Sequence, residues 1–182
     1  MVNILKSFNL PENLYADDVQ NIVGNCIARF GEREWKLVVM TGEIHGHLGI
    51  YSTLGAKMGL FARECFEAQG LDEQHISVLS FAGEQPPVSC LNDGLQISTG
   101  ATLGHGLIRV SPEENKRVEA IFTCGGSSLH LRLKPSFESQ IKADIAQGVA
   151  GYGHSPAYWQ YVRELALRYW SDWNRREIFE AI

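Results

Sequence analysis

The chain has 182 residues, 45% of them hydrophobic and 20% charged, which is the composition of a globular domain with a sizeable core. Its 16 basic and 21 acidic residues give a formal net charge of −5, and this excess of acid argues against nucleic acid or an anionic membrane surface as a partner. No segment approaches the roughly 20 consecutive apolar residues that a membrane-spanning helix needs.

The first two predicted elements lie before residue 45. Apolar residues recur at helical spacing over residues 16–30, and Gly31 follows directly, which is typical of a helix end. Residues 35–44 leave two alternatives open. Val38 and Val39 favour a strand, whereas the length of the segment and its context fit a helix.

A longer helix is predicted over residues 50–68, where apolar side chains share one face. Gly55 and Gly59 lie on nearly the same face of this helix. Each glycine costs a helix about 1 kcal/mol relative to alanine. The close approach of another backbone would offset that cost, so the glycines predict such a contact.

The rest of the chain alternates between strand and helix patterns. Strands are predicted over residues 75–83, 106–111, 117–125 and 128–134, and helices over residues 89–100, 135–149 and 157–182. The strands cluster in the middle of the chain, which predicts an α+β fold with a mixed β-sheet flanked by helices. There is no repeat, charge block or low-complexity linker, so residues 1–182 are expected to form a single domain.

The cysteines indicate a cellular compartment rather than a site. Four of them are scattered along the chain without a CxxC pair, at Cys26, Cys65, Cys90 and Cys124. This spacing is neither a disulfide framework nor a zinc ribbon, and it fits free thiols in a reducing environment. The N-terminus shows no apolar core or cleavage site of a signal peptide, so we expect a cytoplasmic protein.

The sequence EIHGHLGIYSTLGAKMG, residues 43–59, places His45 and His47 one residue apart at the entrance to a predicted helix. In an extended segment such a pair points to the same side, and imidazole is the commonest side-chain ligand of zinc, copper, nickel and iron. The pair therefore indicates a metal site. The alternative is two histidines at a helix end that are satisfied by backbone groups.

Residues 86–106 form a second candidate region, rich in glycine and small polar side chains. So little bulk lets the backbone approach a ligand closely, although a tight turn between a helix and a strand explains the same composition. The glycine spacing excludes a nucleotide phosphate loop. Cys90 matters most here, because one thiolate and two imidazoles are a sound zinc ligand set with an open fourth position. The alternative for Cys90 is a small buried side chain.

The two regions together resemble the FmdE family, named for a component of formylmethanofuran dehydrogenase. The first family motif, His-Gly-His-x-Cys-Pro-Gly before a helix with Gly-x-Arg/Lys, is matched at His45, Gly46, His47, Gly55 and Lys57. The second, Cys-x-x-Asp-x-x-Gln-x-x-Thr-Gly-Cys-Thr-x-Gly-Lys-Gly, is matched in register at Cys90, Asp93, Gln96, Thr99, Gly100, Thr102, Gly104 and Gly106. The resemblance covers residues 43–108.

The resemblance implies one pocket that holds a divalent transition metal, most simply zinc. Its metal ligands would be His45, His47 and Cys90, and its other lining residues Asp93, Gln96, Thr99 and His105. No catalytic residue is assigned. A small-molecule ligand and self-association into dimers are also implied, on a thioredoxin-like α+β core.

Three positions depart from the family pattern. Gly49 and Ala101 replace cysteines, and His105 replaces a lysine or arginine. The change at position 49 removes a thiol beside the histidine pair, so metal ligation or redox chemistry differs here. His105 would supply a ligand or an acid–base group if residues 86–106 line the pocket, and would face solvent if they only form a turn. The paired cysteines of a C-terminal zinc finger, which some members carry, are missing.

The expected function is a metal-binding, FmdE-like protein with an accessory or small-molecule-binding role in one-carbon or redox metabolism. One alternative is a metal-dependent enzyme that acts on a small polar substrate. Another is a non-catalytic partner in an assembly. The molybdenum or tungsten pterin of the dehydrogenase belongs to other polypeptides of that enzyme, and none is expected on this chain.

The aromatic residues near the C-terminus predict a homodimer. They occupy more than one face of the last predicted helix, at Tyr158, Trp159, Tyr161, Tyr169, Trp170 and Trp173. One domain of this size does not readily cover so many rings, and aromatic side chains are enriched in interface cores. We expect this helix, or the face that carries Gly55 and Gly59, to form the contact.

Overall fold

In the computed structural model, which describes residues 14–71, 75–114, 116–153 and 155–182, the N-terminal part of the chain is helical. It forms α1 (Asp17–Gln20), α2 (Val23–Phe30), α3 (Glu32–His45) and α4 (Ile50–Glu67). The prediction of a single helix over residues 16–30 is wrong in one respect. A turn at Asn21 and Ile22 separates α1 from α2.

The ambiguous segment 35–44 is helical and lies within α3. Trp35, Val38 and Thr41 recur every three residues along one face, and all three are buried. The indole of Trp35 stacks on that of Trp170, with ring centroids 4.4 Å apart. Tertiary packing of this face therefore outweighs the strand preference of the two valines.

The C-terminal part supplies the strands and the remaining helices. In chain order they are β1 (Ser77–Ser80), α5 (Leu91–Thr99), β2 (Ile108–Val110), β3 (Glu119–Cys124), β4 (Ser127–Leu133), α6 (Pro135–Tyr152), α7 (Pro156–Asp172), α8 (Arg175–Ile178) and β5 (Phe179–Ala181). The helix predicted over residues 157–182 ends early, because Trp173 is extended and Asn174 caps α8 through its side chain. No helix in these described ranges is both long and apolar enough to cross a membrane.

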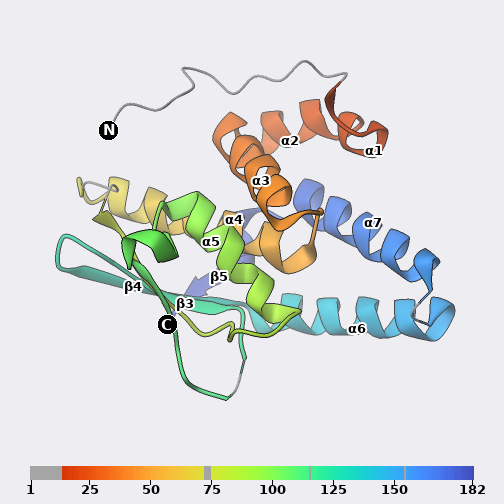
Figure 1. The fold of residues 1–182 in the computed structure, drawn as a ribbon. Helices are drawn as coiled ribbons and strands as arrows, with labels where there is room; N and C mark the ends of the chain where they lie inside the picture. Colours follow the sequence, from red (N-terminus) through yellow and green to blue (C-terminus); the bar gives the residue numbers. More distant parts are fainter. Residues whose placement is uncertain (1–13, 72–74, 115, 154) are drawn as a thin grey trace.

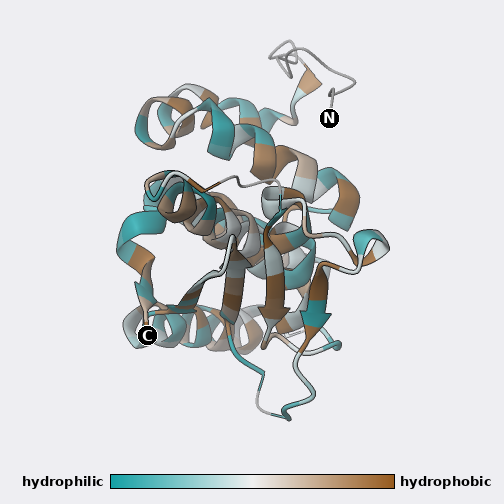
Figure 2. Ribbon diagram, turned by 90° about the vertical axis from the view of Figure 1, so that its left-hand side faces the viewer, coloured by the Kyte–Doolittle hydropathy of each residue, from teal (hydrophilic) through white to brown (hydrophobic). Residues whose placement is uncertain are grey.

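The strands form one mixed sheet in the order β2-β1-β3-β4-β5. β1 and β2 are parallel, and the other neighbouring pairs are antiparallel. α4 and α5 lie over the sheet, and α2 and α3 pack on their far side (Figure 1). Figure 2 shows the same stacking with hydrophobic residues concentrated between the layers. The predicted α+β fold with a mixed sheet is confirmed, whereas the thioredoxin-like core stays a prediction.

α4 and α5 touch along their backbones. A Cβ atom on Gly55 would lie 2.1 Å from the carbonyl oxygen of Leu91, and one on Gly94 would lie 2.2 Å from that of Ser52. Farther along, a Cβ atom on Gly59 would lie 1.9 Å from Oγ of Ser98, so the helices run side by side with their N-terminal ends together. The close approach expected from Gly55 and Gly59 is present, but it is made within this chain. This face is covered by α5 and is not free to form a dimer contact.

A buried ion-pair network centred on Lys57 joins the helical layers. Its Nζ donates to Oε1 of Glu34 at 2.6 Å, and both side chains are almost fully inaccessible to solvent. The same Nζ donates to the carbonyl oxygens of Trp170 and Trp173. Arg175 of α8 donates to the other oxygen of Glu34 at 2.9 Å. Burial lowers the pKa of Lys57, and Glu34 opposes this effect.

Candidate metal and ligand site

The two histidines of the HGH sequence lie on either side of the C-terminal end of α3. His45 is the last residue of the helix, and Gly46 follows in the left-handed conformation with φ 85°. Glycine adopts this conformation at no steric cost. It turns the chain so that the ring centroids of His45 and His47 are 4.4 Å apart. The two imidazoles thus converge through a helix end rather than through an extended segment.

His45 is oriented by a carboxylate from the neighbouring helix. Its Nδ1 lies 2.7 Å from Oδ2 of Asp93 in α5. A carboxylate only accepts, so we assign the imidazole proton to Nδ1, which leaves a lone pair on Nε2. The side chain of His45 is 10% exposed, and its Nε2 is buried without a hydrogen-bond partner among the described residues. A buried polar atom of this kind requires an explanation, and a ligand is one.

His47 is the more exposed member of the pair. Partial burial lowers the pKa of His47, and the neighbouring His45 lowers it further. A lowered pKa favours the neutral imidazole, which is the form that binds metal ions. Its position beside His45 therefore suits it as a second ligand.

Cys90 is the N-cap residue of α5, one helical turn before Asp93. It borders the same cavity as His45 and His47. Burial raises the pKa of the Cys90 thiol, and the charge of Asp93 adds to this effect. Within the described ranges, no three His, Cys, Asp or Glu side chains are gathered closely enough to form a metal-binding group. The structure thus pairs the two histidines and places Cys90 nearby, without assembling the predicted set of three.

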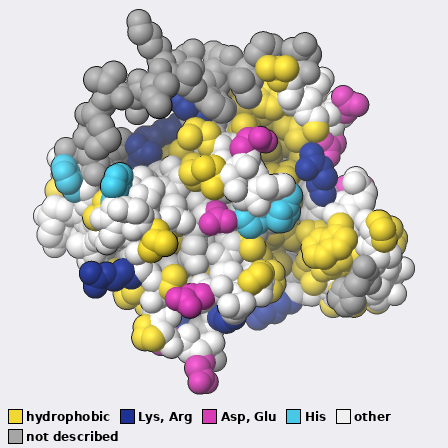
Figure 3. All heavy atoms as spheres, in the orientation of Figure 1, with side chains coloured by type: hydrophobic (Ala, Val, Ile, Leu, Met, Phe, Trp, Pro, Cys, Tyr) yellow, Lys and Arg dark blue, Asp and Glu magenta, His cyan; other side chains and the backbone are white. Residues whose placement is uncertain are grey.

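An apolar cavity of about 650 Å³ opens beside the histidine pair. The N-terminal end of α4 and the Pro86–Pro87 loop form one side, and α6 and α7 form the other. Its lining includes the apolar and aromatic side chains of Tyr51, Ile145, Tyr158 and Trp159. Figure 3 shows histidine side chains near the middle of this face, with hydrophobic side chains beside them toward α6 and α7.

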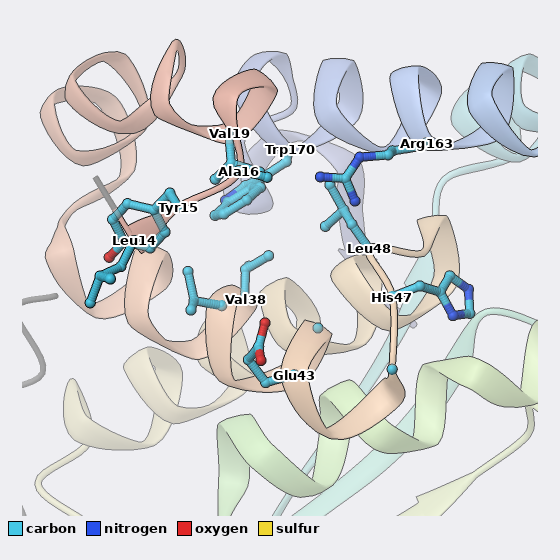
Figure 4. Close-up of a pocket in the computed structure, with 13 residues that line it drawn as sticks. Leu14, Tyr15, Ala16, Val19, Val38, Glu43, His47, Leu48, Arg163 and Trp170 are labelled. Atoms are coloured by element: carbon cyan, nitrogen blue, oxygen red, sulfur yellow. The ribbon is translucent and has the colours of Figure 1, made fainter. Parts of the chain in front are cut away.

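A second cavity, also of about 650 Å³, lies on the other side of the turn that carries His47. Figure 4 shows Arg163 and Trp170 entering it from α7 and Glu43 from α3, with the ring of His47 turned away. The guanidinium of Arg163 is already bound by both carboxylate oxygens of Asp18, at 2.6 and 2.9 Å. His47 borders both cavities, whereas His45 and Cys90 line the apolar cavity and not this one.

Of the other predicted pocket residues, Asp93 contacts His45, and three make contacts elsewhere. Gln96 accepts a hydrogen bond from the backbone of Leu103, and Thr99 bonds to the backbone at the C-terminal end of α5. His105 is exposed in the 3-10 turn Leu103–His105 beyond that end. None of the three lines the apolar cavity. For His105 this placement favours the alternative of a simple turn.

Gly49, where the resemblance expects a cysteine, lies directly beside the unpartnered nitrogen. A Cβ atom at this position would be 3.4 Å from Nε2 of His45 and 2.9 Å from Oγ of Ser52. The backbone of Gly49 is extended, with φ −113° and ψ 153°, so any residue can adopt it. The thiol that a cysteine would supply at position 49 would therefore lie at the centre of the candidate site.

Sequence reasoning does not identify the residues of α6 and α7 that wall the cavity. Ile145, Ala146 and Val162 carry no motif, and the sequence pattern assigns Tyr158 and Trp159 to an interface. The one indication in the sequence that these residues line a cavity is that Trp159 lies off the apolar stripe of its helix. The side chain of Trp159 is 62% exposed. Tertiary packing alone brings them to the histidine pair.

Comparison with known protein families identifies the family of the chain. Residues 44–180 match the family model described as "FmdE, Molybdenum formylmethanofuran dehydrogenase operon". No match was found among curated proteins. The matched range includes the histidine pair, Cys90, Asp93 and the strands β1 to β4, and it ends within β5. Because the match extends over most of its length and well beyond the two motifs, the chain belongs to the FmdE family.

Proposed function

We propose that this chain is a metal-binding protein with an accessory or small-molecule-binding role in one-carbon or redox metabolism. The metal would be a divalent transition ion, most simply zinc, held by His45 and His47. The observation that carries the proposal is Nε2 of His45, which is buried without a partner among the described residues while Asp93 holds Nδ1. A carboxylate on one nitrogen is the usual support for a histidine whose other nitrogen binds a metal ion.

Cys90 is the third donor that we propose, because it borders the same cavity as the two histidines. The pKa of its thiol is raised by burial, so the thiolate forms only at a cost that a bound cation offsets. Three protein donors at most leave a coordination position open. A bound ion in such a site acts as a Lewis acid or orients a ligand.

The two alternative functions are supported unequally. An open coordination position supports a metal-dependent enzyme, but the apolar walls of the cavity do not suit a small polar substrate. The assembly-partner alternative loses support on two counts. α5 covers the glycine face of α4, and Tyr158, Tyr169 and Trp170 are buried within this chain.

Metal analysis tests the proposal. The wild-type chain, purified without added metal, is expected to carry about one divalent ion per chain, and His47→Ala to fall well below that because one of the few donors is lost. His105→Ala is the matched control, since this histidine is exposed outside the cavity and should leave the metal content unchanged. A metal-free wild type that also fails to take up zinc, or an unaltered metal content in His47→Ala, would contradict the proposal.

We also propose that the chain is a homodimer. The apolar side chains that remain exposed include Val149, Tyr152 and Trp159, at 38%, 48% and 62%, around the junction of α6 and α7. Trp159→Glu should shift the dimer to the monomer in sedimentation experiments at micromolar concentration, because it places a charge in the proposed contact. Leu103→Glu, at a position 75% exposed elsewhere, is the control and should stay dimeric. A monomeric wild type would end this proposal.

A further inference from the structure

Residues 46–49, which we call the strap, lie between the two large cavities. Gly46 and Leu48 line only the second cavity, and Gly49 lines only the apolar one. His47 borders both. We propose that the strap is a movable partition, and that ligation of a metal ion by His47 fixes its position and keeps the two cavities separate. The inference rests on the proposed function, because the ion is the one proposed there.

The backbone of the strap has little support of its own. α3 ends where the N–H of Gly46 donates to the carbonyl of Gly42, and α4 begins where the N–H of Thr53 donates to that of Gly49. Between these two points, His47 and Leu48 make no backbone hydrogen bond to another described residue. A segment with few backbone hydrogen bonds opens locally at a lower free energy than a helix or a strand. We therefore expect the strap to move more readily than the helices on either side of it.

Glycines at both ends allow the strap to turn as a unit. Gly46 has a φ of 85°, and a Cβ atom there would meet no atom within 4 Å, so its surroundings leave room for a change of conformation. Gly49 is extended and has no side chain that could hold it in place. Hinges are often small residues at the ends of elements, because these positions absorb changes in φ and ψ. The two residues between the glycines therefore decide where the strap rests.

Leu48 holds the strap on the side of the second cavity. Its side chain is half-buried and packs against the hydrophobic cluster that contains Trp35, Val38 and Trp170. Figure 4 shows Leu48 and Trp170 at this cavity, with the ring of His47 directed away from it. A single half-buried leucine is a modest anchor, since its contribution scales with the apolar area that it removes from water.

Ligation by His47 would add a second anchor on the other side. The ring centroids of His45 and His47 are 4.4 Å apart, and Nδ1 of His45 lies 2.7 Å from Oδ2 of Asp93. An ion shared by the two imidazoles would tie the strap to α3 and, through Asp93, to α5. A ligand that binds only one of two conformations shifts the population toward that conformation. Metal occupancy would then control whether the two cavities are separate.

The indole of Trp170 reports whether the strap has moved. Trp170 lines the second cavity and is 2% exposed, and its Nε1 has no hydrogen-bond partner among the described residues. Only the packing of its neighbours, Leu48 among them, keeps water from this N–H group. The indole of Trp35 is the matched control, because its Nε1 donates to the hydroxyl of Tyr15 at 3.1 Å and it does not line the cavity.

Hydrogen exchange of these two indole N–H groups, followed by NMR in the metal-depleted full chain and again after addition of zinc, tests the inference. We expect zinc to slow exchange at Trp170 by about tenfold or more, because the strap can move only after His47 has left the ion. Exchange at Trp35 should stay unchanged. Elemental analysis of the same samples measures zinc uptake.

The two measurements distinguish this inference from the proposed function. Zinc uptake without slower exchange at Trp170, or with equal slowing at both indoles, would overturn the inference and leave the metal proposal standing. A wild-type chain that takes up no zinc would overturn the proposed function, and the inference with it.

Two substitutions that each remove one proposed donor separate the strap from metal binding in general. His47 lies on the strap, whereas Cys90 is the N-cap residue of α5. Cys90→Ala, brought to the same zinc occupancy as the wild type, should retain the slower exchange at Trp170. His47→Ala should exchange at the metal-free rate, whether or not it still takes up zinc through His45. Slow exchange that persists in His47→Ala, or that is lost from fully occupied Cys90→Ala, would contradict the strap as the moving part.

Discussion

Replacing Glu34 by glutamine is expected to lower the free energy of unfolding by about 3–5 kcal/mol, the cost of leaving one member of a buried ion pair without its partner. Lys57 would keep its two backbone carbonyl acceptors but lose the only carboxylate that its Nζ contacts among the described residues. Arg175 would be affected less, because Glu64 also accepts from it. Urea or guanidinium unfolding at neutral pH measures the loss.

The pH dependence of this variant identifies Lys57 as the cause. Burial already lowers the pKa of Lys57, and removal of Glu34 lowers it further. The unfolded chain then binds a proton that the folded chain does not, so the stability of Glu34→Gln should rise with pH toward the ordinary range of lysine. The combined variant Glu34→Gln with Lys57→Met should recover much of the loss.

A surface pair provides the control for Glu34. Glu138 and Lys142 form an i,i+4 pair on α6 whose side chains are 44% and 72% exposed. Glu138→Gln should cost less than about 1 kcal/mol, because water screens the charge that remains. Equal losses for Glu34→Gln and Glu138→Gln would show that the buried network does not stabilise the fold as described.

Gly49→Cys is expected to raise the affinity for zinc by at least about tenfold, the lower end of what one supporting residue contributes to a metal site. Its Cβ would lie 3.4 Å from Nε2 of His45, which brings a thiol next to the atom that we propose binds the metal. The N-cap position of the 18-residue helix α4 also stabilises a thiolate. Oγ of Ser52, 2.9 Å from the new Cβ, has to rotate.

Competition against a chelator of known zinc affinity measures the gain. Gly104→Cys is the matched control, because it introduces a thiol where no atom lies within 4 Å of the new Cβ and far along the chain from the histidines. It should leave zinc affinity unchanged. Weaker zinc binding by Gly49→Cys, or the same increase in both variants, would contradict the assignment of His45 as a ligand.

The sequence predicts the fold class, which is confirmed, and it predicts a site at the histidine pair, which stays a prediction. The reasons for both are local. Glycine between two histidines allows their rings to converge, and the spacing of Gly55 and Gly59 indicates a backbone contact, which α5 makes. The family motif places Asp93 in the same pocket, and it does bond to His45. These features need only a few neighbouring residues to be interpreted.

The places of the other predicted pocket residues depend on distance along an element, and their part in a pocket stays a prediction. α5 has nine residues at about 1.5 Å of rise each, so Thr99 lies about 13 Å from Cys90 although both belong to one motif. His105 is farther along the chain still. The cavity walls and the strand β5 depend on how α6 and α7 pack, and no periodicity in the sequence encodes that packing.

The backbone contact between α4 and α5 also fixes where Asp93 lies. A Cβ atom on Gly55 or Gly94 would overlap backbone atoms of the other helix, so the two helices have no space to slide past each other. Asp93, next to Gly94 on α5, is therefore held in a fixed position relative to α4, and a substitution at Gly55 or Gly94 would displace the carboxylate that bonds to Nδ1 of His45.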